Sequence, residues 1–185
     1  MTPRIRPRTP VELSDDERVL YTAITGGRRA RGPQHFALTR ADGSLQGPFD
    51  ALLLSPPVGG AMQELGAAIR YGTQLDGRAR EIAILLVAAR HDSAFERESH
   101  EAIARAIGFT STELAALREE RVSAFSGDDA LVARVVVSLL DGDLDEVLWD
   151  EASRVLSARA VFELSALVGY YGTLALQLRI FRVEA

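Results

Sequence analysis

Apolar residues recur three and four positions apart along most of the 185-residue chain, the spacing of helices that bury one face. No stretch shows the strict alternation of apolar and polar residues that a half-buried β-strand requires. Capping boxes, prolines and glycines mark where helices begin and end. The pattern predicts an all-α protein with a single domain over residues 1–185, and helices near 14–26, 50–54, 55–71, 76–91, 92–108, 110–117, 128–141, 143–149 and 157–181.

Two segments fall outside this helical pattern. Residues 1–13 are rich in arginine and proline and predict an extended N-terminal arm. Residues 28–49 are broken by Gly32-Pro33, Asp42-Gly43 and Gly47-Pro48, which predict a long loop with one turn. A loop of this length inside one domain is usually functional or part of an interface.

The chain is organised around two consecutive helices within 76–108. The first carries eight consecutive apolar residues, Ile82–Ala89, with Glu81 at their head. It should be buried on most sides. Glu163 has a similar position at the head of the last helix. Duplication of a helical hairpin and chance explain this similarity equally well.

The second helix is amphipathic and breaks its own pattern. We expect one arc to face solvent, made of Arg97, Glu98, Glu101 and Arg105. Glu96 and His100 fall on the opposite, apolar arc, one helical turn apart. A carboxylate and an imidazole facing a core or a cleft are costly unless they pair. Such a pair can exchange a proton near neutral pH, which suits general acid–base catalysis.

Composition excludes several kinds of chemistry. The net charge of −5 and the lack of a basic stripe argue against a nucleic-acid partner. Cysteine is absent, which removes disulfides, thiolate nucleophiles and sulfur-ligated metals, and all 21 basic residues are arginine, which removes lysine Schiff bases. With no signal peptide and no apolar run of about 20 residues, we expect no membrane partner and a cytoplasmic location.

The run HEAIARAIGFTSTELAAL, residues 100–117, resembles the signature of the carboxymuconolactone decarboxylase family. The resemblance extends to GPFDALLLSPPVG, LGAAIRYGTQLDGRAREIAIL and ELSALVGYYGTLALQLRIF, so it covers most of the chain. It implies an AhpD-like helical bundle built from helical hairpins. It also implies a homo-oligomer. Members of the family are often trimers or hexamers, and a dimer is the alternative.

The AhpD branch of this superfamily is a thiol peroxidase that uses a Glu, a CxxC pair and a His four residues after the second Cys. Glu81 and His100 match the Glu and the His, whereas Ser93 and Glu96 stand at the cysteine positions. Sequence-based transfer would assign peroxidase or peroxiredoxin activity, but the thiol chemistry cannot occur here. The decarboxylase branch resembles this chain in placing a Glu four residues before the His.

The resemblance implies a lyase-type decarboxylation of a small carboxylated lactone or oxo acid. It needs no cofactor, because the conjugated carbonyl of the substrate takes the electrons. His100 is the candidate acid, Glu96 its partner and Glu81 an orienting residue, while Arg78, Arg80 and Tyr171 are candidate substrate contacts. We expect no metal, since Glu96 and His100 would need a third ligand and His35 is the obvious imidazole. The alternative is a non-catalytic, oligomeric binding or scaffold protein in which the buried pair fixes helix register or lies at an interface.

Overall fold

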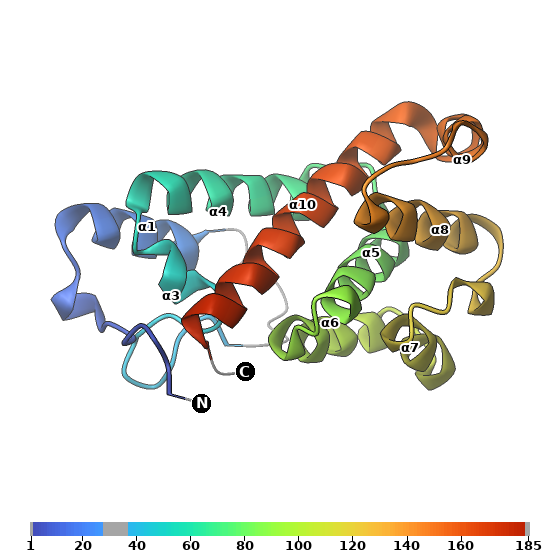
Figure 1. Ribbon diagram of the computed structural model, residues 1–185. Coiled ribbons are helices and arrows are strands. Elements are labelled where there is room, and N and C mark those ends of the chain that lie inside the picture. Colours follow the sequence, from blue (N-terminus) through green and yellow to red (C-terminus); the bar gives the residue numbers. More distant parts are fainter. Residues whose placement is uncertain (1, 28–36, 184–185) are drawn as a thin grey trace. The chain divides into compact units, whose positions relative to one another are not determined.

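Helices make up nearly all of the regular structure in a computed structural model that describes residues 2–27 and 37–183 (Figure 1). Within those ranges the β-structure is one antiparallel bridge between Thr39 and Leu45. Gly43, with φ +85°, makes the turn between them. The all-α prediction is confirmed for these ranges. The first part of the predicted 28–49 loop, with His35, lies outside the described residues.

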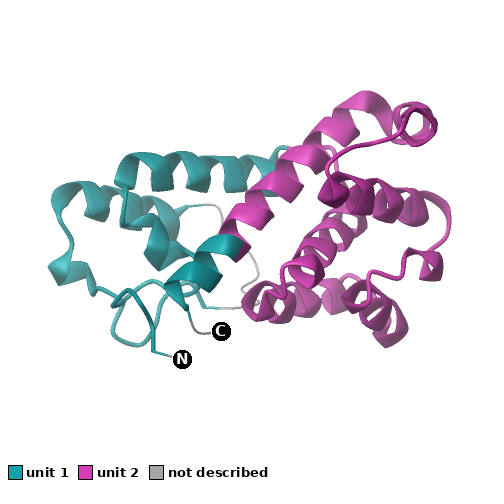
Figure 2. Ribbon diagram, in the orientation of Figure 1, with its two compact units in different colours: residues 1–72, 176–185 teal, residues 73–175 magenta. Residues whose placement is uncertain are grey.

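The helices group into two compact units, coloured separately in Figure 2. The first comprises residues 1–72 and 176–185, and the second comprises residues 73–175. The last helix contributes residues to both. The prediction of one domain stays a prediction.

The first unit contains η1 (Pro10–Glu12), α1 (Asp15–Gly26), α3 (Phe49–Leu52) and α4 (Pro56–Tyr71). The predicted capping box opens α1, where Ser14 N donates to Glu17 Oε2 at 2.9 Å and Glu17 N donates to Ser14 Oγ. Apolar side chains from α1, α3, α4 and the Thr39–Leu45 turn form its core, namely Leu13, Leu20, Ile24, Leu38, Leu45, Phe49, Leu52 and Leu53 with Tyr21 and Met62. The N-terminal arm is anchored on this unit, because Arg4 N donates to Phe181 O at 2.9 Å.

The second unit is built around α5 (Gly77–Arg90), which packs against α6 (Ala94–Ala106), α7 (Ser111–Arg118) and α8 (Gly127–Asp141). As the apolar run predicts, α5 is buried on most sides, with Ile82 and Leu86 fully enclosed. Asp76 Oδ1 accepts from Ala79 N at 2.7 Å and fixes where α5 begins. The predicted capping box of Thr110 and Glu113 likewise opens α7.

The unit is completed by α9 (Glu146–Ala152), the π-helical segment η3 (Ser153–Ser157) and α10 (Ala158–Phe181). Asp145, and not Asp143, caps α9, because its side chain accepts from Leu148 N. Ser157 opens α10 as predicted, its Oγ accepting from Ala160 N at 3.2 Å. The stretch Glu146–Phe181 is long and apolar enough to cross a membrane, but half of its apolar window is buried, as in the core helix of a folded domain.

Candidate functional site

Two neighbouring helices of the second unit bring three ionisable side chains into the same buried place. Glu81 lies in the second turn of α5, and Glu96 and His100 lie one turn apart on α6. Their relative exposures are 1%, 3% and 4%. The apolar arc of α6 therefore does point inward with its two polar side chains, as the sequence pattern predicts.

The imidazole of His100 lies between the two carboxylates. Its Nδ1 is 2.7 Å from Glu81 Oε2, and its Nε2 is 3.6 Å from Glu96 Oε2. An ionised carboxylate only accepts hydrogen bonds, so Nδ1 carries the hydrogen in the short contact. The longer contact exceeds hydrogen-bond length. Glu81 thus fixes the ring through Nδ1, whereas Glu96 makes no hydrogen bond to Nε2.

Two tyrosines of α10 complete the surroundings of the imidazole. The rings of His100 and Tyr171 meet edge to face, with centroids 5.3 Å apart and an angle of 87°. Tyr170 packs against Tyr171 in the same way. Such T-shaped contacts favour one ring orientation. Tyr171 therefore lies where the sequence analysis places a substrate contact, although its role stays a prediction.

The two candidate arginines, Arg78 and Arg80, differ in how many hydrogen bonds their guanidinium groups make to other side chains. Arg78 donates to Asp129 at 2.7 Å and to Glu113 at 2.5 Å, and its guanidinium lies 4.1 Å from the centroid of the Phe109 ring. That guanidinium holds α5, α7 and α8 together. Arg80 has a buried Nε without a hydrogen-bond partner, 3.9 Å from Glu81 Oε1. Of the two, Arg80 is the better placed to receive a carboxylate.

Glu101 corrects the predicted solvent arc of α6. It is only 5% exposed and accepts hydrogen bonds from Arg118 of α7 and from Arg105 one turn away. Burial acts to raise the pKa of Glu101, but the hydrogen bonds from the two arginines outweigh it and lower that pKa below its ordinary value. Helical periodicity placed Glu101 outside because it takes no account of the arginine on α7.

Ser93 and Glu96, which stand at the two cysteine positions of the AhpD pattern, lie next to different groups. Ser93 is 7% exposed, precedes α6, and has a buried Oγ that neither caps the helix nor finds another partner. Glu96 faces His100. Among residues 2–27 and 37–183, no group of three or more His, Asp or Glu side chains is placed to hold a metal ion.

The described fold resembles a solved structure of known activity. The match is a crystal structure of a Cys-to-Ala variant of the debrominase Bmp8 in complex with 2,3,4-tribromopyrrole, at a TM-score of 0.71. It covers 100% of this chain and 94% of that chain at 14% sequence identity. At this identity the likeness establishes the fold alone. Comparison with curated proteins gives no match.

The described residues combine an all-helical fold with a buried Glu–His–Glu cluster, and the chain has no cysteine. Residues 56–138 match the carboxymuconolactone decarboxylase family, and this segment contains Glu81, Glu96 and His100. The predicted resemblance to this family is confirmed over residues 56–138. The absence of cysteine fits the branch that lacks the CxxC pair.

Proposed function

We propose that the protein is a cofactor-free, lyase-type enzyme that acts on a small carboxylated lactone or related oxo acid. The observation that supports this reading is the placement of His100 between two buried carboxylates, one at hydrogen-bond distance and one beyond it. A buried imidazole with one nitrogen fixed and the other facing an acid is suited to moving a proton.

The roles follow from the two distances. Glu81 accepts from Nδ1–H and holds the ring as a positioning residue. In the reaction the carbon–carboxylate bond breaks, carbon dioxide leaves, and the electron pair moves into the conjugated carbonyl to form an enolate. Glu96 supplies a proton to the bare Nε2 of His100, the resulting imidazolium delivers that proton to the enolate carbon, and solvent returns a proton to Glu96. The acid–base step contributes roughly 10²–10⁴-fold to the rate.

Substrate contacts are assigned to the groups nearest this proton path. Arg80, whose Nε makes no hydrogen bond, is assigned to the substrate carboxylate, and the ring of Tyr171 forms a wall beside the imidazole. Arg78 was a second candidate, but its partners Asp129 and Glu113 already take its guanidinium.

We also propose that the protein is a cytoplasmic homo-oligomer. Within the second unit large apolar side chains of α9, η3 and α10 are exposed, with Val147 at 77%, Val155 at 46% and Phe162 at 71% exposure. Small residues, Ser165, Gly169 and Thr173, continue this surface along α10. Exposed apolar helix faces are typical of surfaces covered by another chain.

The test is an assay of carboxymuconolactone decarboxylation, in which the released carbon dioxide is measured. His100→Gln and Glu96→Gln should each abolish turnover while circular dichroism and native mass stay unchanged. Glu98→Gln is the matched control, because Glu98 lies two residues from Glu96 on the exposed side of α6. If His100→Gln alters stability alone, the non-catalytic scaffold is the correct reading. Hydroperoxide consumption by metal-free protein would contradict both.

A further inference from the structure

The first unit contains a groove whose lining is typical of a ligand site. The Glu–His–Glu cluster belongs to the second unit, so the groove is a different site. It has a volume of about 430 Å³ and is lined by Asp16, Val19, Leu20, Ala23, Pro56, Pro57, Gly60, Gln63 and Glu64. The α1 members are spaced three or four residues apart, so a continuous stripe of α1 faces a stripe of α4. The volume falls in the range of small-molecule sites, about 300–1,000 Å³.

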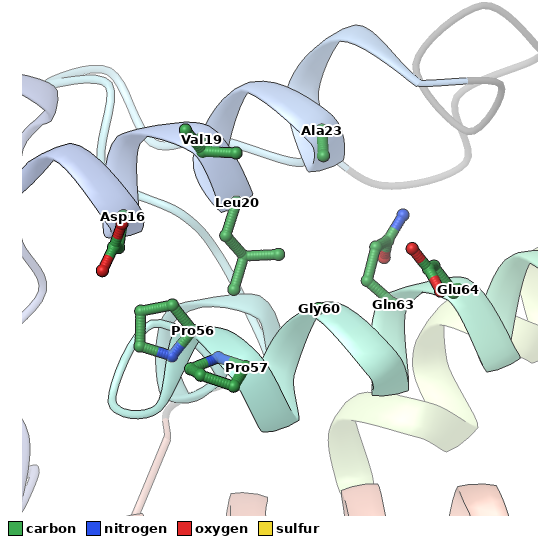
Figure 3. A pocket seen from close by; sticks show the side chains of 9 residues that line it. All are labelled: Asp16, Val19, Leu20, Ala23, Pro56, Pro57, Gly60, Gln63 and Glu64. Carbon is green, nitrogen blue, oxygen red and sulfur yellow. The ribbon is translucent and has the colours of Figure 1, made fainter.

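The floor of the groove is apolar. Figure 3 shows Leu20 of α1 pointing toward Pro56 and Pro57 at the beginning of α4. Val19, which also lines the groove, is 71% exposed. Such a surface favours an apolar molecule, because covering it removes apolar area from water.

Gly60 gives the groove its depth. A glycine inside a helix costs about 0.5–1 kcal/mol relative to alanine, and it is usually explained by close packing. Its neighbour Gly59 has that explanation, since a Cβ there would lie 2.2 Å from Leu52 O. A Cβ at Gly60 would meet nothing within 4 Å. The missing side chain at Gly60 leaves room in the groove and serves no packing contact.

The described polar side chains of the groove are one amide, Gln63, and two carboxylates, Asp16 and Glu64. Gln63 is 8% exposed, and its Oε1 is buried without a partner. Because Gln63 lines the groove, rotation of its amide brings this acceptor to a donor held there. The exposed carboxylates of Asp16 and Glu64 lie toward the two ends of the groove (Figure 3). None of the described residues that line the groove is basic.

We propose that the α1–α4 groove binds a small organic cation, an apolar body that carries a primary ammonium group. The apolar floor takes the body. The ammonium donates to Gln63 Oε1 and is attracted by Glu64 and Asp16, which favour a cation over a neutral or anionic molecule of the same shape.

The experiment uses the full-length protein and three probes of one shape: benzylammonium, benzyl alcohol and benzoate. Calorimetry and amide chemical-shift mapping should show saturable binding of benzylammonium, with shifts confined to α1 and α4. Benzyl alcohol should bind at least about tenfold more weakly, and benzoate should not bind. Glu64→Gln should weaken binding about two- to fivefold, as for an exposed charge pair. Gln63→Leu should weaken it about two- to tenfold.

Gly60→Leu, whose Cβ would meet nothing within 4 Å, fills the groove and should abolish binding, while Gly60→Ala adds one methyl group and should keep it. Turnover at His100 should be the same in all these variants. Binding in the groove is therefore tested independently of the proposed activity. It is overturned if benzylammonium does not bind at millimolar concentration, if benzyl alcohol binds as well, or if the shifts lie in residues 73–175. A change of native mass in Gly60→Leu would also overturn it, because the groove would then be an interface between copies.

Discussion

Replacing Glu81 by glutamine should separate positioning of the imidazole from the fold of the domain. The substitution keeps the shape of a side chain that is 1% exposed and removes its charge. A hydrogen bond to a charged group contributes about 1.5–3 kcal/mol and a neutral one about 0.5–1.5 kcal/mol, so the loss of stability should be about 1–1.5 kcal/mol. For a chain of this size that lowers Tm by about 2–6 °C.

The effect on His100 should be larger than the effect on stability. The glutamine amide can accept from Nδ1–H or donate to a bare Nδ1, so the imidazole is no longer restricted to one tautomer. Turnover should fall roughly 10²-fold or more with KM unchanged, because the lost interaction acts on proton transfer and not on substrate binding. Nitrogen-15 shifts of the ring, which report the tautomer without any substrate, should change from Nδ1–H alone to a mixture.

Glu163→Gln is the matched control for this experiment. Glu163 is 8% exposed, belongs to the same unit, and accepts from Arg159 Nε at 2.8 Å and from Gln74 N at 2.9 Å. It should lose a similar amount of stability and leave the tautomer of His100 and turnover intact. The reasoning is refuted if Glu81→Gln keeps the pure Nδ1–H tautomer, or if both variants reduce turnover alike.

Three further predictions concern stability. Arginine hydrogen bonds hold the pKa of Glu101 below its ordinary value despite burial, so Glu101 stabilises the fold above about pH 4.5 and this contribution is lost as the pH falls through the lowered pKa. Glu101→Gln should therefore cost about 1–3 kcal/mol at pH 7 in urea titrations, and less at pH 3; an equal cost at both would contradict this. Burial raises the pKa of Asp50, so its contribution has the opposite sign and wild-type stability falls as the pH rises from about 3.8 through that raised pKa. Asp50→Asn should keep or gain stability at pH 7, and a loss above about 1 kcal/mol would count against the argument. Gly59→Ala should cost about 1–3 kcal/mol by overpacking against Leu52, whereas Gly60→Ala should gain about 0.5–1 kcal/mol; the two Tm values, measured side by side, should move in opposite directions.

Local signals were enough to predict most helix boundaries. The capping boxes at Ser14 and Thr110 and the cap at Asp76 all act within three residues of the helix they open. Such bonds depend on the chain immediately around them, so a single sequence displays them. The helix predicted from residue 143 begins later, at Glu146, because the side chain of Asp145 caps it.

Contacts between helices could not be predicted in the same way. Periodicity identified Glu96 and His100 as inward-facing, since both lie on one helix. Periodicity gave no sign of Glu81, which is 19 residues away and was named as an orienting residue only through the family resemblance. Its distance of 2.7 Å from the imidazole depends on how α5 and α6 pack. Glu101 was assigned to solvent for the same reason, because Arg118 reaches it from α7.

The sequence by itself determined that the chain is helical, where most helices begin, that thiol chemistry is impossible, and which two side chains break the apolar face of α6. These properties follow from composition and from spacing along one helix. The tertiary structure decided which nitrogen of His100 is held, which arginine keeps an unpartnered nitrogen, and that α1 and α4 leave a groove at Gly60. Each of these depends on atoms far apart in the chain, whose separation is set by the packing of whole helices and not by any local pattern.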